Sequence, residues 1–477
     1  MNPAAGVTLP LWLFVVLVLL AGWSLLVLLF APGMRWFFRR RVNQVIGQIN
    51  TRLAIRLPSF ALTRREVLID RLFHDPKVQA AAAEHAKAAN EPLSATWHRV
   101  DRLAREIVPS FNAWIYFRVG YALARGVARL IYRVRIGYVD EEALSRVKPD
   151  STVVFVINHR SNMDYVLVAF LAAERTALSY AVGEWARVWP LQQLIRAMGA
   201  FFVRRNSGDP LYRAVLARYV AMATGAGVTQ AMFPEGGLTI DGRLRQPKFG
   251  LLDYMLKEFD EREGEGRRDV VFIPVGINYD RVLEDRSQLL KLHPERKRAG
   301  MGTALWRSLG FFVRNLGQMG TGRWHRFGYA CVNFGTPLSM REWCAGRGVR
   351  LTTLAEDARR AEVAAVGTRL MEAVGRVVPV LPVSLVASLM MEAPRRAWSA
   401  LELKAAALAR IERLAAAGAR LYVPRGDQDY AIDVGLRMLT LRHLVIERDG
   451  MFAPAEEDIA VLAYYANAIG HIDPAAA

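Results

Sequence analysis

The sequence predicts an α/β protein: a mostly parallel sheet flanked by helices, with an N-terminal transmembrane helix and helical accessory regions on both sides of the sheet. Three observations indicate this class. An uncharged apolar stretch lies near the N-terminus, short β-rich runs alternate with helical stretches in the middle of the chain, and the last part is rich in Ala and Leu. Strands that alternate with helices are typical of parallel sheets covered on both faces.

The 477 residues are enough for two or three domains at about 150 residues each. Changes of composition along the chain indicate four parts. We expect a membrane anchor with a basic flank at 1–42, a helical and partly membrane-interfacial region at 43–140, an α/β domain at 141–350 and a helical C-terminal domain at 351–477.

The stretch Leu9–Ala31 is predicted to span a membrane. It carries no charged residue, and as a helix it would reach about 35 Å, enough for a hydrocarbon core of about 30 Å. Arg35 and Arg39–Arg41 follow it, and basic residues after a span mark its cytoplasmic end. A cleaved signal peptide, the alternative, would have a basic start and a shorter apolar stretch. We therefore expect a protein of the cell membrane whose remaining chain lies on the cytoplasmic side.

Two later segments also have apolar patterns. Phe111–Tyr138 is predicted as a helix with arginines beside an aromatic and apolar stripe. The stripe consists of Trp114, Phe117, Tyr121, Ala124, Ala128 and Ile131. Such a helix lies in the membrane interface or packs on the domain, and both options stay open. The apolar run Val377–Met391 contains Pro379 and Pro382 and is too short for a span, so we expect a buried helix there.

Short β-rich runs define the predicted sheet. They are Thr152–Ile157, Ser179–Val182, Ala200–Val203, Thr229–Phe233, Val270–Val275 and Gly328–Phe334. Helices are expected at Leu211–Thr224, Leu251–Phe259, Thr352–Gly375, Arg395–Ala417 and Glu456–Ile469.

The charge balance indicates an anionic partner. The formal net charge is +18, from 63 Lys and Arg against 45 Asp and Glu. Such a surplus suits a membrane surface, a nucleic acid or a substrate with phosphate groups. Because the basic residues are scattered and follow the predicted anchor, we expect no nucleic-acid partner. The 2 cysteines are too few for a disulfide framework or a Cys-rich zinc site, and we expect no metal.

Polar or Gly-rich clusters directly follow four of the β-runs. They are Asn158–Asp164 (NHRSNMD), Arg204–Asn206 (RRN), Pro234–Gly237 (PEGG) and Gly276–Arg281 (GINYDR). In an open α/β sheet, ligands bind beyond the carboxyl ends of the strands. We therefore expect one crevice that gathers a His, an Asp, a Glu and several arginines.

His159 and Asp164 form the predicted acid–base pair. A turn after the strand brings these two positions together, and a carboxylate that accepts from one imidazole nitrogen leaves the other nitrogen free as a base. Because the chain has 8 His, this spacing also arises by chance, and a capping or core role for His159 stays open.

The cations beside the crevice are predicted to bind phosphate. Arg204 and Arg205 leave a strand together, and arginine forks match phosphate oxygens bidentately. Arg243 and Lys248 are the second pair of candidates. An exposed charged loop is the alternative for the Arg pair.

The PEGG cluster is predicted to form a tight turn. Gly236 and Gly237 let the backbone approach a ligand closely. Glu235 either orders the turn by accepting backbone N–H bonds or holds a substrate hydroxyl, and a helix N-terminal acid is its structural alternative. Ser161 lacks the G-x-S-x-G elbow of a nucleophile, so we expect a structural role for it.

Four ordered segments resemble the sequence blocks of the glycerolipid acyltransferases, specifically the glycerol-3-phosphate acyltransferase branch. The segments are Asn158–Tyr165, Gly199–Arg205, Phe233–Gly237 with Gly242–Arg243, and Val271–Arg281. Val332–Leu338 is similar to a segment that follows them. Leu462–His471 resembles a C-terminal segment that the smaller lysophosphatidate acyltransferases usually lack. One departure is that Leu238–Ile240 stands where the third block usually has an arginine, so Arg204, Arg243 and Lys248 would have to supply its charge.

The resemblance implies an O-acyltransferase whose acyltransferase domain is the α/β part, 141–350. It implies transfer of a fatty acyl group from acyl-CoA or acyl-carrier protein to the 1-hydroxyl of glycerol 3-phosphate, the first step of phospholipid synthesis. His159, oriented by Asp164, would be the general base of a direct transfer without a cofactor. Arg204, Arg205, Glu235, Gly236, Gly237, Arg243 and Lys248 would bind the acceptor. The bilayer would receive the product, with Trp306–Phe327 as a further membrane contact or an ordinary surface loop.

Two other interpretations of the function stay open. The acceptor is alternatively 1-acylglycerol 3-phosphate or dihydroxyacetone phosphate. Outside the enzymes, a membrane-anchored lipid-binding protein is the alternative. The sequence does not indicate the acyl carrier, the chain length or the oligomeric state.

Overall fold

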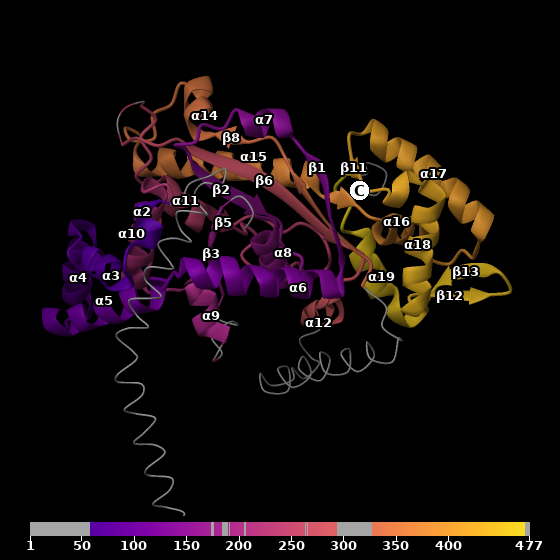
Figure 1. Ribbon diagram of the computed structural model, residues 1–477, viewed down its shortest axis with the longest axis horizontal. Coiled ribbons are helices and arrows are strands. Elements are labelled where there is room, and N and C mark those ends of the chain that lie inside the picture. The colour runs from indigo at the N-terminus through magenta and orange to yellow at the C-terminus, as the bar shows by residue number, and fades with distance from the viewer. Residues whose placement is uncertain are drawn as a thin grey trace, which may run out of the picture. The chain divides into compact units, whose positions relative to one another are not determined.

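The computed structural model (Figure 1) describes the chain from residue 58 to 472 with several gaps. The described residues are 58–172, 176–183, 189, 191–204, 207–262, 264, 266–292 and 327–472. The predicted anchor at Leu9–Ala31, its basic flank, Arg205 and all but the end of Trp306–Phe327 lie outside them. Within these residues no helix is both long and apolar enough to cross a bilayer.

The expected helices before the sheet are present in the described part of 43–110. They are α2 (Ser59–Leu62), α3 (Arg65–Phe73), α4 (Pro76–Ala89) and α5 (Leu93–Ile107). Local sequence sets the ends of α4, because the Asp75 carboxylate accepts the Lys77 N–H at its start and Asn90 adopts a left-handed conformation at its end. The buried side of α5, with Val100 and Leu103, packs in the core that covers one face of the sheet.

The helix expected at Phe111–Tyr138 is shorter than predicted. A π-helical turn η1 (Ile115–Gly120) continues into α6 (Tyr121–Ile131), and strand β1 (Arg133–Val139) follows. The prediction was therefore wrong beyond Ile131, because β1 pairs with a strand that is distant in the sequence. The π-turn also changes which residues face inward, since its wider turn departs from the 3.6-residue period. Tyr116 is buried, whereas Trp114 of the predicted stripe is 36% exposed.

The central sheet confirms the predicted α/β class. Its strands run in the order β1-β7-β6-β2-β5-β3-β4, and β8 pairs with β6. All pairings are parallel except β6 with β7 and β6 with β8. The remaining bounds are β2 Thr152–Ile157, β3 Ser179–Val182, β4 Phe201–Phe202, β5 Gln230–Met232, β6 Val270–Tyr279, β7 Tyr329–Phe334 and β8 Leu338–Ser339.

Helices cover both faces of this sheet (Figure 1). The alternation along β2 shows this, because Val153 and Phe155 belong to one hydrophobic cluster while Val154 and Val156 belong to the other. The first cluster includes α6 and α8, and the second includes α5, α10 and α15. The bounds of the helices between strands are α7 Glu141–Ser145, α8 Met163–Ala172, α9 Leu191–Ala197, α10 Pro210–Gly225, α11 Gly250–Leu256, α12 Asp285–Leu289 and η3 Leu290–Leu292.

The region after β8, which was expected to be helical, contains short strands as well as helices. A three-stranded sheet, β10-β13-β12, and a pair, β11-β9, accompany its helices. The apolar run at Val377–Met391 does contain a buried helix, which begins at Pro382. The bounds are α14 Met340–Arg347, α15 Glu356–Val377, β9 Pro379–Val380, α16 Pro382–Glu392, β10 Trp398–Ser399, α17 Ala400–Ala416, β11 Arg420–Leu421, η4 Pro424–Gly426, α18 Gln428–Leu441, β12 Val445–Arg448, β13 Met451–Pro454, η5 Glu456–Asp458 and α19 Ile459–Ala466.

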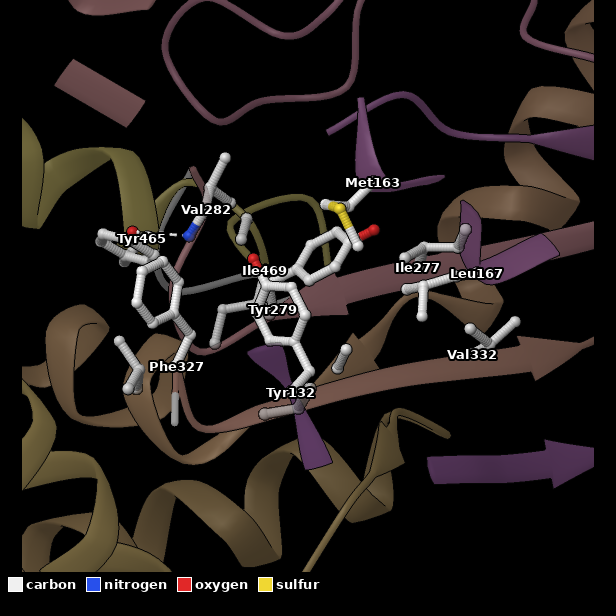
Figure 2. Close-up of a cluster of buried hydrophobic side chains, with 14 of the residues drawn as sticks. Tyr132, Met163, Leu167, Ile277, Tyr279, Val282, Phe327, Val332, Tyr465 and Ile469 are labelled. Carbon is white, nitrogen blue, oxygen red and sulfur yellow. Dashed lines mark hydrogen bonds between the residues drawn. The ribbon is translucent and has the colours of Figure 1, made fainter. Parts of the chain in front are cut away.

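This C-terminal region shares its core with the sheet. The cluster that contains Tyr132 and Ile277 continues through Tyr465 and Ile469, as Figure 2 shows. The rings of Tyr132 and Tyr279 lie 5.1 Å apart there. The domain boundaries expected from composition, at 42, 140 and 350, stay predictions.

Candidate active site

His159 and Asp164 meet at the carboxyl end of β2. The strand ends at Ile157, and α8 begins at Met163 with Asp164 in its first turn. His159 Nδ1 lies 2.9 Å from Asp164 Oδ2. The same carboxylate oxygen accepts the backbone N–H groups of Arg160 (2.8 Å) and Ser161 (3.0 Å). Because Oδ2 is surrounded by donors, the imidazole presents Nδ1–H to it.

The other imidazole nitrogen is left without a partner. His159 Nε2 is buried and has no hydrogen-bond partner in the described part of the chain, and the side chain is 2% exposed. The ring lies 4.4 Å from the Phe233 ring at 34° and contacts the Tyr165 ring edgewise at 5.4 Å. With Nδ1 protonated, Nε2 carries a lone pair and is able to accept a proton from a hydroxyl.

Tyr279 is a site residue that sequence reasoning did not single out. It ends β6, the neighbour of β2 in the sheet, and its hydroxyl donates to Asp164 Oδ1 at 2.5 Å. Burial raises the pKa of Tyr279 well above its ordinary value, and the nearby Asp164 acts in the same direction. The hydroxyl is therefore a permanent donor, and it fixes the second oxygen of the carboxylate that orients His159. Its only sequence signal was its place in the polar cluster at 276–281.

Glu235 holds the turn after β5 against His159. Its Oε1 accepts the His159 N–H at 2.7 Å, and its Oε2 accepts the Arg245 N–H at 2.9 Å. This is the turn-ordering option of the two expected for Glu235. Burial raises the pKa of this carboxyl to about 7. The Thr239 N–H also donates to the His159 carbonyl at 2.9 Å, so this loop fixes the backbone of His159 on both sides.

The turn itself requires glycine at its tight point. Gly236 has a φ of +64°, and a Cβ added there would lie 2.9 Å from Lys248 Cδ. Gly237 follows in the same turn, and the Lys248 N–H closes the loop by donating to the Pro234 carbonyl at 2.7 Å. Arg243 and Lys248 are both exposed on this loop.

Arg204 is not part of this hydrogen-bond network. Its guanidinium forms a two-pronged ion pair with Glu106 of α5, at 2.8 Å and 2.5 Å. The strand that precedes it, β4, is three places from β2 in the sheet, which corresponds to about 14 Å at the usual strand spacing. By contrast, Tyr279 ends β6 and Glu235 follows β5, and these two strands flank β2. Strand order therefore decides which polar clusters meet, and the sequence does not reveal that order.

The polar residues after His159 are also fixed in place. The Ser161 hydroxyl accepts the Met163 N–H and donates to Glu284 at 2.7 Å, which is the structural role expected for Ser161. The Glu284 carboxylate also accepts from the backbone N–H and the side-chain amide of Asn162. Burial raises the pKa of Glu284. Among the residues that the structure describes, no group of His, Cys, Asp or Glu side chains is arranged to bind a metal ion.

Two family models match the chain. Residues 136–278 match the acyltransferase family, and residues 316–474 match the C-terminal region of glycerol-3-phosphate acyltransferases. A crystal structure of the 1-acyl-sn-glycerophosphate acyltransferase PlsC from Thermotoga maritima is 17% identical and covers 54% of this chain and 78% of that chain, with a TM-score of 0.31. The fold class therefore rests on the sheet topology above.

Curated relatives carry the name glycerol-3-phosphate acyltransferase. One from Xanthomonas campestris is 28% identical over 78% of this chain, and one from Xanthomonas axonopodis is 30% identical over 65% of it. One from Pseudomonas putida is 28% identical over 64% of this chain. These matches cover 40%, 32% and 34% of the relatives' own lengths. The two family models and these relatives agree: the chain belongs to the glycerol-3-phosphate acyltransferase family.

Proposed function

We propose that this chain transfers a fatty acyl group from an acyl thioester, acyl-CoA or acyl-carrier protein, to the 1-hydroxyl of glycerol 3-phosphate. The reaction would be the first step of phospholipid synthesis. One observation carries the proposal: a buried imidazole whose Nδ1 is bound to a carboxylate and whose Nε2 is free, at the carboxyl end of a central strand. Membership of the family supplies the acceptor and the reaction class.

The chemistry assigned to His159 is general-base catalysis. Nε2 takes the proton of the 1-hydroxyl as that oxygen attacks the thioester carbonyl, and Asp164 stabilises the imidazolium that forms. When the tetrahedral intermediate collapses, the carbon–sulfur bond breaks and the sulfur takes the proton from the imidazolium. The products are 1-acylglycerol 3-phosphate and the free thiol. General-base help of this kind is typically worth about 10²- to 10⁴-fold in rate.

Several residues support this role of His159 without taking part in the proton transfer. Tyr279 and the backbone N–H groups of Arg160 and Ser161 hold the Asp164 carboxylate. Glu235 holds the His159 backbone, and Gly236 with Gly237 would let the acceptor approach the turn. Arg204, Arg205, Arg243 and Lys248 stay predicted ligands of the acceptor phosphate, although Arg204 would have to exchange Glu106 for it.

Membrane attachment is a second part of the proposal. The outer side of η1 and α6 exposes Trp114, Val119 and Leu123, which are 36%, 40% and 51% accessible. Arg118 and Arg125 lie exposed on the same helix. One side of this helix packs on the domain through Ala124, Ala128 and Ile131, and the exposed apolar side chains next to arginines on its outer side suit the headgroup region of a bilayer. With Leu9–Ala31 as the anchor, we propose a cell-membrane location with the active site on the cytoplasmic side.

The test is His159→Ala in purified full-length protein in nanodiscs, with labelled glycerol 3-phosphate and both thioester donors. We expect kcat to fall at least about 100-fold, because the base is lost. His98→Ala, which changes an exposed histidine of α5, is the matched control and should leave kcat unchanged. Turnover by His159→Ala close to that of the wild type would rule out His159 as the base.

The same assay separates the alternatives. Turnover with 1-acylglycerol 3-phosphate or dihydroxyacetone phosphate in place of glycerol 3-phosphate would reassign the acceptor. Lysophospholipid binding without turnover of any thioester would indicate a lipid-binding protein. Arg204→Ala should lower the melting temperature, because the pair with Glu106 joins α5 to β4. A KM for glycerol 3-phosphate raised tenfold would place Arg204 at the acceptor, and a KM within threefold of wild type would assign it to anchoring.

A further inference from the structure

Arg160 is a buried cation whose hydrogen bonds are incomplete. The residue is 3% exposed, and its Nη1 donates to the Gly242 carbonyl at 2.8 Å. Its Nε and Nη2 have no hydrogen-bond partner among the described residues. A guanidinium carries five N–H donors, and a buried charge that keeps unpaired donors is costly to the fold. The proposed base mechanism uses only the backbone N–H of Arg160.

Tyr464 presents a second unpaired donor beside it. The Tyr464 ring lies 5.2 Å from Arg160 Cζ, its side chain is fully buried, and its hydroxyl has no hydrogen-bond partner in the described part of the chain. Burial raises the pKa of Tyr464, so the hydroxyl stays protonated and able to donate.

The neighbouring Tyr465 is different. Its hydroxyl donates to Asp285 at 2.6 Å and accepts from the Val282 N–H and from Arg442. The dashed line in Figure 2 marks the bond between Val282 and Tyr465. One tyrosine hydroxyl of this pair is therefore fully used by the fold, whereas the other is not.

The C-terminal segment is packed so that Tyr464 is held over Arg160. Gly242 has a φ of +91°, and a Cβ added there would lie only 1.9 Å from the Tyr464 carbonyl oxygen. Asn467 Nδ2 donates to the Asp241 carbonyl at 2.9 Å. The loop with Asp241 and Gly242, whose Gly242 carbonyl accepts from Arg160, therefore packs against the backbone of the segment that carries Tyr464. These two contacts fix that segment next to Arg160.

We propose that Arg160, which directly follows the proposed base His159 in the sequence, and Tyr464 form a buried subsite for the phosphate of glycerol 3-phosphate. This inference rests on the proposed function and names the residues that recognise its acceptor. An arginine fork whose Nε and Nη2 both lack partners, together with a neutral hydroxyl donor, matches the oxygens of a phosphomonoester. Because both side chains are enclosed, the subsite suits a small phosphate rather than the bulky nucleotide of CoA.

The subsite also gives the C-terminal segment a role at the reaction centre. Arg160 directly follows the proposed base, whereas Tyr464 belongs to the stretch Leu462–His471. The acceptor phosphate would therefore be bound by two distant parts of the chain. A structural role is the competing explanation: Arg160 would only join the Gly242 loop to the Tyr464 ring, through one hydrogen bond and a cation–π contact.

The experiment compares Tyr464→Phe with Tyr465→Phe in purified full-length protein. Both changes remove one hydroxyl and keep the ring. We expect Tyr464→Phe to raise the KM and the Kd for glycerol 3-phosphate by about 10-fold or more, because a hydrogen bond to a charged group is lost. Its melting temperature and its KM for the acyl donor should not change. Tyr465→Phe should do the reverse, lowering the melting temperature and leaving the KM for glycerol 3-phosphate unchanged.

Arg160→Lys adds a second measurement. It keeps the charge but not the fork, so we expect the Kd for glycerol 3-phosphate to rise by at least as much as in Tyr464→Phe. Calorimetry with glycerol 3-phosphate and with inorganic phosphate gives this readout without turnover. Unchanged KM and Kd values in Tyr464→Phe and Arg160→Lys would overturn the subsite.

The outcomes for the subsite and for the enzyme are distinguishable. Wild-type protein that binds glycerol 3-phosphate through these residues, but transfers no acyl group from either thioester, would refute the proposed function and support the subsite. Normal turnover with unchanged phosphate binding in the variants would refute only the subsite. A rise in the KM for acyl-CoA alone would assign the two residues to the phosphates of the donor and overturn the assignment to the acceptor.

Discussion

Replacing Asp164 by Asn isolates the charge of the carboxylate from its geometry. Asp164 Oδ2 accepts from His159, Arg160 and Ser161, while Oδ1 accepts from Tyr279. An Asn side chain keeps one carbonyl oxygen for the three donors and turns its NH₂ toward the Tyr279 oxygen, which is able to accept instead of donate. The shape of the site is therefore retained, and the negative charge beside the imidazolium is lost.

The expected loss follows from the distance between the two groups. His159 Nδ1 and Asp164 Oδ2 lie 2.9 Å apart, which puts the charge centres about 4 Å apart and makes their attraction about 4 kcal/mol at an effective dielectric constant of 20. At about 1.4 kcal/mol per factor of ten, kcat should fall about 10³-fold.

The assay is thiol release from an acyl thioester at saturating glycerol 3-phosphate, with the melting temperature as the check on folding. Asp101→Asn, which changes an acid of the Asp101–Arg105 pair on α5 with 40% of its side chain exposed, is the control and should keep full activity. Asp164→Asn with kcat within fivefold of wild type would refute the reasoning, because the imidazolium would then need no carboxylate.

Two further predictions concern the loop that surrounds the site. Gly242→Ala should destabilise the fold by about 3 kcal/mol or more, because its Cβ would meet the Tyr464 carbonyl and φ is +91°. The control is Gly126→Ala on α6, which has open space around it and should be neutral or stabilising. Equal melting temperatures for the two variants would contradict this prediction. For Glu235, burial raises the pKa to about 7, so the folded state keeps a proton that the unfolded chain releases. The stabilisation is then complete below about pH 4.5 and is lost as the pH rises through 7, up to about 3 kcal/mol. Glu235→Gln should reduce the fall of the free energy of unfolding between pH 5 and 8. The remaining fall is due to Asp280, because burial also raises the pKa of Asp280 to about 7. A pH slope equal to that of the wild type would contradict the assignment of this fall to Glu235.

Local patterns predicted those parts of the molecule that depend on near neighbours. β2 and β3 have the predicted bounds, because continuous apolar runs between polar turns have few other solutions. The contact of His159 with Asp164 was also predictable, since one strand-to-helix turn is enough to form it. The end of the helix at Ile131 was not, because the residues after it join a sheet whose partner strand lies far along the chain.

The sequence by itself therefore determined the α/β class, the contact between His159 and Asp164 and the family. The tertiary structure decided which of the other polar clusters reach that pair. Strand order puts Glu235 and Tyr279 beside His159 and leaves Arg204 with Glu106. Packing of the C-terminal segment then places Tyr464 over Arg160. Strand order and long-range packing arise from contacts between distant segments, and residue spacing along the chain does not record those contacts.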